Sequence, residues 1–142
     1  MRYTIEDVRK QWDEVFNAQY AAKISRDLLP KYESPRGISK KLVNYCLDTT
    51  HSIGKHKAVV FQSALGYNIS NAGALERQIE KGLRVYRGIP LGDSSYGYRY
   101  NVVMLVKGAN GKTQPVVTSW IYDKGYDTPR MVTAYVSEKR RP

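Results

Sequence analysis

The spacing of apolar residues changes near residue 88, and this change constrains the fold more than any other feature of the sequence. Upstream, apolar side chains recur at helical intervals, as Leu75, Ile79 and Leu83 do. Downstream, short runs rich in valine, tyrosine and threonine alternate with turn residues, which is typical of strands. We therefore expect helices over about 5–28, 38–47, 53–65 and 71–85, and strands over 98–106, 116–122 and 131–136.

This order of elements predicts an α+β fold. The Asn-Gly pair at 110–111 indicates a hairpin between the first two expected strands, and residues 123–129 join the second strand to the third. Helices followed by a strand meander favour an antiparallel sheet that the helices cover on one face.

Charge divides the chain into two parts. Residues 1–33 carry six basic and six acidic side chains, whereas residues 34–142 carry seventeen and seven, so the whole net charge of +10 lies in the second part. Residues 30–37, PKYESPRG, have the composition of a linker. We expect a helical N-terminal segment (1–33) and a separate basic domain (34–142). A strongly basic domain favours a polyanionic partner such as nucleic acid, although a solvated basic surface is the simpler alternative.

Several classes of function are disfavoured by what the sequence lacks. It has no run of about 18 apolar residues and no apolar stretch near its start, so we expect neither a membrane span nor a self-contained secretory signal. The chain can still be a fragment of a larger exported protein. The single cysteine, Cys46, fits a core thiol better than a nucleophile. CxxC and HExxH motifs are absent, and His51 and His56 are five residues apart, so we expect no metal and no cofactor.

Both histidines of the protein fall in one basic run, His51 to Phe61. On a helical wheel Gly54, Ala58, Phe61 and Leu65 share one face, which we expect to face the core. His56 lies roughly opposite, and Lys57 lies at the margin of the apolar face. The run therefore predicts a helix that presents His56 and Lys57 at the surface.

These residue types suit the cleavage of RNA without a metal. That reaction needs a base for the 2′-hydroxyl, an acid for the leaving 5′-oxygen, and cations or donors for the phosphate. His56 is our first candidate for proton transfer. Lys57 and His51 are further catalytic candidates, and Lys55 is a candidate phosphate contact near a helix N-terminus. The alternative for all four is a solvated helix face or loop.

Further candidates lie in the expected strands. Alternation places Thr118 and Trp120 on one face, where a hydroxyl donor beside an indole suits a phosphate next to a base, although a cross-strand threonine and a half-buried tryptophan fit equally well. Tyr98 shares a face with Tyr100, while Arg99 takes the other face. Tyr98 and Arg99 are candidate substrate contacts, and the alternative is that they are ordinary strand residues. Arg130 is expected to add electrostatic attraction.

The order and spacing of these residues resemble a family of bacterial toxins. The residues concerned are His51-x-x-Gly54-x-x-Lys57-Ala58-x-x-Phe61, then Leu65-Gly66-Tyr67, then Thr118-x-Trp120-Ile121. Over roughly residues 38–136 this pattern resembles the C-terminal toxin domain of CdiA-type contact-dependent growth inhibition effectors. It is distantly similar to the colicin D ribonuclease domain, whose histidine position is occupied here by Lys57, with His56 one residue earlier.

The resemblance implies that residues 34–142 form a metal-independent tRNA nuclease of the barnase/EndoU/colicin/RelE-like fold. It implies that residues 1–33 serve for entry or for packing. It implies a toxin that is part of a secreted or cell-surface effector and acts in the cytoplasm of a neighbouring bacterium. Its implied partners are tRNA, a cognate immunity protein and, for some members, a translation elongation factor. The alternatives are a nucleic-acid-binding module without catalysis and a toxin nuclease that acts on DNA. No paired carboxylates lie near the basic run, which argues against a metal-dependent nuclease.

Overall fold

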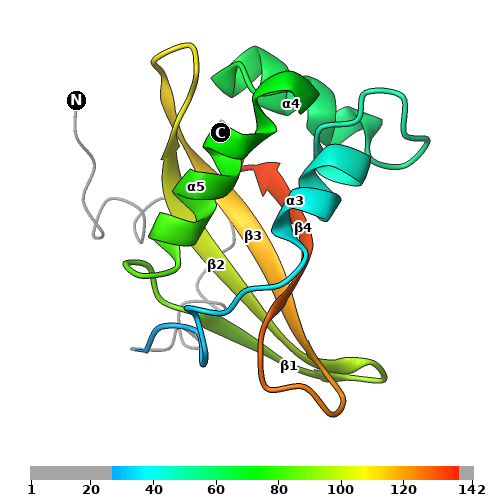
Figure 1. Ribbon diagram of the computed structural model, residues 1–142, viewed down its shortest axis with the longest axis vertical. Coiled ribbons are helices and arrows are strands. Elements are labelled where there is room, and N and C mark those ends of the chain that lie inside the picture. The colour runs from blue at the N-terminus through cyan, green and yellow to red at the C-terminus, as the bar shows by residue number, and fades with distance from the viewer. Residues whose placement is uncertain (1–26, 138–142) are drawn as a thin grey trace, which may run out of the picture.

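A computed structural model describes residues 27–137, with helices in the first half and a sheet in the second (Figure 1). Residues 1–26, which include most of the helix expected over 5–28 and most of the N-terminal segment expected over 1–33, therefore lie outside the described residues. The described elements, in chain order, are α3 (Ile38–Lys41), π-helix η1 (Leu42–Cys46), α4 (Lys55–Leu65), 3₁₀-helix η2 (Ile69–Asn71), α5 (Ala72–Gly82), β1 (Ile89–Ser94), β2 (Gly97–Lys107), β3 (Thr113–Asp123) and β4 (Arg130–Val136).

The four strands form one antiparallel meander in the order β1-β2-β3-β4. The pairing of β2 with β3 runs unbroken from Gly97 opposite Asp123 to Lys107 opposite Thr113. The turn between these strands carries the Asn110-Gly111 pair, so the predicted hairpin is confirmed. The α+β class and the strand meander are likewise as expected, and β1 and β4 form the two edges of the sheet.

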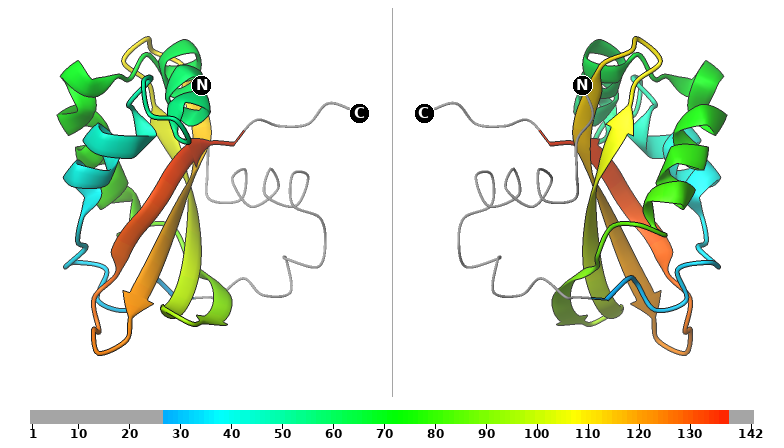
Figure 2. Two further views of the ribbon diagram at one scale, coloured as in Figure 1. Left: turned by 90° about the vertical axis from the view of Figure 1, so that its right-hand side faces the viewer. Right: turned by 90° about the vertical axis from the view of Figure 1, so that its left-hand side faces the viewer.

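The helices cover one face of the sheet, as Figure 2 shows. The core lies between them: Phe61 and Leu65 of α4 and Leu75 of α5 meet sheet residues such as Met104 and Trp120, and all five are fully buried. Alternate residues of the strands, including Val103 and Val117, form a smaller buried cluster on the opposite face.

Helix α4 confirms the predicted wheel. Ala58, Phe61 and Leu65 are buried, His56 is exposed, and Lys57 is half-buried at the margin. The helix ends at Leu65 and is capped by Gly66, whose left-handed backbone (φ 74°) turns the chain so that the N–H of Tyr67 donates to the carbonyl of Phe61 (3.4 Å). This conformation favours glycine, which has no Cβ to clash.

Two elements differ from the sequence prediction. Strand β1 was not predicted, because Pro90 and Gly92 interrupt any apolar alternation; an edge strand with a register shift between these residues accommodates both. The helix expected over 38–47 changes from α to π geometry after Lys41. Among residues 27–137 no helix is long and apolar enough to cross a membrane.

The outer side of β4 is partly occupied by the segment before α3. The N–H of Arg36 donates to the carbonyl of Pro129 (2.8 Å), and the N–H of Met131 donates to the carbonyl of Arg36 (3.0 Å). This short parallel bridge brings the start of α3 against the start of β4. It positions the lysines of α3 beside Arg130.

Candidate active site

Two pockets lie along the β4 edge of the sheet. The larger, which we call the α3 pocket, has a volume of about 300 Å³ and is lined by Gly37, Lys40, Lys41, Asn44, Tyr45, His51, Arg130 and Met131. The smaller, the α4 pocket, has a volume of about 160 Å³ and is lined by His56, Lys57, Val60, Tyr135 and Val136. Neither lining contains a carboxylate, so cationic side chains determine the potential in both.

A single hydrogen bond connects the two pockets. The ammonium group of Lys57, in the α4 pocket, donates to the hydroxyl of Tyr45, in the α3 pocket, over 3.1 Å. Two cations also lie near the Tyr45 ring, with Lys57 Nζ 5.2 Å and Lys41 Nζ 5.6 Å from its centroid. Since Lys57 occupies one oxygen lone pair, the hydroxyl proton of Tyr45 remains able to donate to another group.

Local backbone geometry places Tyr45 there. Tyr45 belongs to the π-helix η1, a rare conformation that is frequent at functional sites and rotates later side chains relative to an α-helix. Gly54, just before α4, allows a close approach: a Cβ at this position would lie 2.6 Å from the Tyr45 carbonyl oxygen and 3.0 Å from its Cδ1. The absent side chain of Gly54 therefore lets α4 bring Lys57 to the Tyr45 hydroxyl.

His51 is committed to a hydrogen-bond donor role. Its Nδ1 accepts from the backbone N–H groups of Ile53 and Gly54, each over 3.0 Å. A neutral imidazole with an accepting Nδ1 carries its proton on Nε2. Its ring meets the Tyr45 ring edge to face, with centroids 4.9 Å apart. His51 therefore lines the α3 pocket as an N–H donor, and its catalytic role stays a prediction.

His56 is better suited to proton transfer. Its side chain is exposed on the first turn of α4 and lines the pocket that also contains Lys57. Within the described part of the chain, neither ring nitrogen makes a side-chain or backbone hydrogen bond. Both nitrogens are therefore available to substrate.

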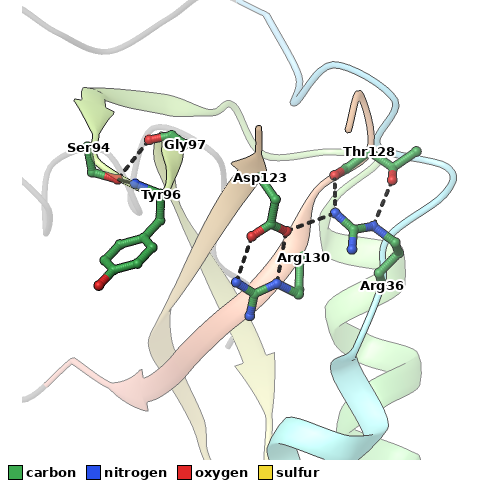
Figure 3. A network of polar contacts seen from close by, with 7 residues as sticks. All are labelled: Arg36, Ser94, Tyr96, Gly97, Asp123, Thr128 and Arg130. Atoms are coloured by element: carbon green, nitrogen blue, oxygen red, sulfur yellow. Dashed lines mark hydrogen bonds and ion pairs between the residues drawn. The ribbon is translucent and has the colours of Figure 1, made fainter. Parts of the chain in front are cut away.

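Arg130 is held rigidly at the rim of the α3 pocket (Figure 3). Its Nε and Nη2 donate to the two carboxylate oxygens of Asp123, each over 2.9 Å. Arg36 donates to the same carboxylate over 3.2 Å. Its guanidinium group also donates to the hydroxyl and to the backbone carbonyl of Thr128. Hydrogen bonds from Arg130, with a smaller contribution from Arg36, lower the pKa of Asp123 to about 2. One carboxylate thus orients two guanidinium groups and leaves the cluster with a net positive charge.

Thr118 and Trp120 lie in the core and not at the site. They share a face, as alternation predicted, but both are 0% exposed. The indole N–H of Trp120 donates to the Thr118 hydroxyl (2.8 Å), which donates to the carbonyl of Val102 (2.9 Å). The helices cover this face, so the two side chains satisfy one another and have no surface for RNA. The predicted catalytic role of Thr118 and the predicted stacking role of Trp120 are therefore wrong.

Three other predicted residues line neither pocket. Lys55 is exposed at the start of α4. Tyr98 is exposed at the β1–β2 end of the sheet, where its ring lies 5.2 Å from that of Tyr100. Arg99 is half-buried, and its Nε finds no hydrogen-bond partner among residues 27–137. Their contact with substrate stays a prediction.

Cys46 is fully buried, and its burial raises the pKa of the thiol, so it is a core residue as expected. The described residues contain no group of three histidine, cysteine or acidic side chains with the geometry of a metal site.

Sequence reasoning missed Tyr45, Lys40 and Lys41. The available signal was the Lys40-Lys41 pair, which lies in the basic part of the chain four residues before Tyr45. Apolar spacing alone predicts an ordinary short helix over 38–47 and assigns it no chemical role. The contact between Tyr45 and Lys57 spans twelve residues and depends on the packing of η1 against α4.

Fold and site together define an α+β domain with a basic, carboxylate-free pair of pockets at one edge of its sheet. The family model of DUF6883, a domain of unknown function, matches residues 28–138, and the chain belongs to this family. Comparison with curated proteins finds no match. Comparison with solved structures likewise finds none.

Proposed function

We propose that this protein is a metal-independent ribonuclease that cleaves tRNA by transesterification. The observation that carries the proposal is the Lys57–Tyr45 hydrogen bond, which joins a pocket containing His56 to a pocket containing His51 and Arg130. Cations, an available imidazole and a hydroxyl donor thus lie together where no lining residue is acidic. These are the groups that phosphodiester cleavage requires in the absence of a metal.

The proposed reaction assigns each group one task. His56 takes the proton from the 2′-hydroxyl, whose oxygen attacks the phosphorus. The bond from phosphorus to the 5′-oxygen breaks, and Tyr45 donates its hydroxyl proton to that oxygen. Lys57 stabilises the resulting tyrosinate and, with Lys41, the charge that develops on the phosphate. The products are a 2′,3′-cyclic phosphate and a 5′-hydroxyl.

The biological setting follows from the resemblance to CdiA-type toxins. We propose that the domain is delivered into neighbouring bacteria, acts in their cytoplasm and is blocked by a cognate immunity protein. A translation elongation factor is a further proposed partner. The basic character of residues 34–142 supports a polyanionic target.

The experiment is a tRNA cleavage assay with purified protein in EDTA, followed by mapping of the RNA ends. Wild-type protein should leave cyclic phosphate ends. His56→Ala, Lys57→Ala and Tyr45→Phe should each slow cleavage by about 10²- to 10⁴-fold, the range of general acid–base catalysis. Lys112→Ala, in the β2–β3 turn, is the matched control and should cleave at the wild-type rate.

Three outcomes would reject the proposal. Intact tRNA after incubation with protein, cell extract and GTP contradicts catalysis, and salt-dependent binding without cleavage would then identify a binding module. A magnesium requirement together with DNA damage would identify a DNA nuclease. Full activity of all three site variants would place the chemistry elsewhere.

A further inference from the structure

We propose that the α3 pocket binds one unpaired nucleotide of the RNA, next to the phosphate that is cleaved, so that cleavage takes place in a single-stranded loop. This inference rests on the proposed function for the identity of the substrate. The pocket itself is assigned from its volume, its charge and its connection to Lys57. Binding to it is measurable without cleavage.

The volume fits a mononucleotide. The α3 pocket holds about 300 Å³, at the lower end of the range for small-molecule sites. A nucleotide within a duplex is stacked and paired, so it reaches such a pocket only by leaving the helix, which costs its stacking and pairing free energy. A nucleotide in a loop has already left the helix, and the pocket therefore selects single-stranded RNA.

The charge fits a phosphate group. Lys40 and Lys41 approach from α3, and Arg130 approaches from β4. Asp123 binds Arg130 through Nε and Nη2, and Nη1 makes no hydrogen bond to any residue of the described range. His51 adds an N–H donor, because its Nδ1 is occupied by the backbone. The cations come from two elements and converge on one cavity with no lining carboxylate.

The remaining polar group fits the edge of a base. Asn44 lines the same pocket, and its amide provides both a donor and an acceptor. The Tyr45 hydroxyl and its bonded Lys57 mark the boundary with the α4 pocket. A nucleotide in the α3 pocket therefore has its neighbouring phosphate at the proposed catalytic groups.

The test measures binding of small ligands to the His56→Ala protein by calorimetry. The probes are the four nucleoside 3′-monophosphates, inorganic phosphate and the four nucleosides. We expect at least one mononucleotide to bind about tenfold more tightly than phosphate or its own nucleoside. Lys41→Ala and Asn44→Ala, added to this protein, should each weaken that binding several-fold, and Lys112→Ala should leave it unchanged.

A second arm uses wild-type protein and one RNA sequence, presented as a single strand and as a duplex. We expect the single strand to be cleaved at least a hundredfold faster, the equivalent of about 2.7 kcal/mol. Equal rates would overturn the inference, and so would mononucleotide binding no tighter than phosphate binding. Mononucleotide binding without any RNA cleavage would support the nucleotide site and reject the proposed ribonuclease activity. The two proposals can therefore fail separately.

Discussion

At the scale of single residues, Thr118 shows how burial decides a role that side-chain chemistry leaves open. Its hydroxyl accepts from the buried indole of Trp120 and donates to the carbonyl of Val102. Both partners lie in the core, so water cannot replace the hydroxyl. Such a group supports the fold and has no route to a substrate.

Thr118→Val should therefore reduce stability and spare catalysis. It leaves the indole N–H of Trp120 without an acceptor, and the expected loss in the free energy of unfolding is about 1–3 kcal/mol. Urea unfolding measures this loss, and tRNA cleavage per folded molecule should match that of wild type. If the variant were as stable as wild type but no longer cleaved tRNA, Thr118 would have a catalytic role after all.

Tyr45 shows the converse: contacts with other segments give a chemical role to a residue that the sequence did not single out. Tyrosine is an ordinary residue on a half-buried helix, and apolar spacing assigns it no chemical role. Its hydroxyl gains a role because Lys57, twelve residues later, donates to it and His51 packs against its ring. The chemical environment of Tyr45 is thus produced by three separate segments.

At the scale of elements, the contact between η1 and the start of α4 determines the geometry of the site. Gly54→Ala should disrupt it, because the new Cβ would lie 2.6 Å from the Tyr45 carbonyl oxygen. Overpacking of this kind costs about 1–3 kcal/mol, and the shift of Tyr45 from Lys57 should slow cleavage further. Thermal unfolding and the cleavage rate measure the two effects.

Gly73→Ala in α5 is the matched control. Its Cβ would lie 3.6 Å from the nearest atom, an ordinary contact, so the change should stabilise the protein by roughly 0.4–1 kcal/mol and leave cleavage unchanged. If Gly54→Ala behaves like Gly73→Ala, close packing at Gly54 does not position the site.

The β3–β4 connection should make stability depend on pH in the acid range. Asp123 binds two arginines, and these contacts lower its pKa from 3.8 to about 2. A depressed folded-state pKa means that the stabilisation is fully present above the unfolded pKa and is lost as the pH falls through the folded one. The contribution of Asp123 should therefore disappear between about pH 5 and pH 2.

Asp123→Asn isolates this contribution. At pH 7 the variant should unfold at lower urea than wild type, because Arg36 and Arg130 lose their shared anion. The difference between the two proteins should shrink as the pH falls toward 2. A difference that stays constant over this range would show that the charge of Asp123 does not stabilise the fold.

At the scale of the whole molecule, the net charge of +10 and the basic β4 edge should make RNA binding strongly salt-dependent. A plot of log affinity against log salt for the His56→Ala protein should be linear. Lys40→Ala with Lys41→Ala should flatten its slope by about one unit for each phosphate that these lysines neutralise. An unchanged slope would show that the α3 lysines do not bind the RNA backbone, and Lys112→Ala is again the control.

Much of the architecture could be predicted because periodicity is a local property of the chain. The change near residue 88 predicted the class, and the wheel predicted the buried face of α4 with His56 exposed. Strand β1 was not predicted, since Pro90 and Gly92 obscure its pattern and only pairing with β2 makes it a strand. Burial of Thr118 and Trp120 was left open for a similar reason: alternation defines a shared face, and other elements determine whether that face is covered.

The sequence alone therefore determined which segments form helices and strands, the location of the basic excess and the surface position of His56. These properties follow from backbone sterics and apolar spacing within one element. Tertiary structure alone decided that His51, Tyr45, Lys57 and Arg130 meet at one edge while Trp120 is enclosed. Those four site residues lie between six and 85 positions apart along the chain, and they come together because the helices bury their apolar faces on the same side of the sheet.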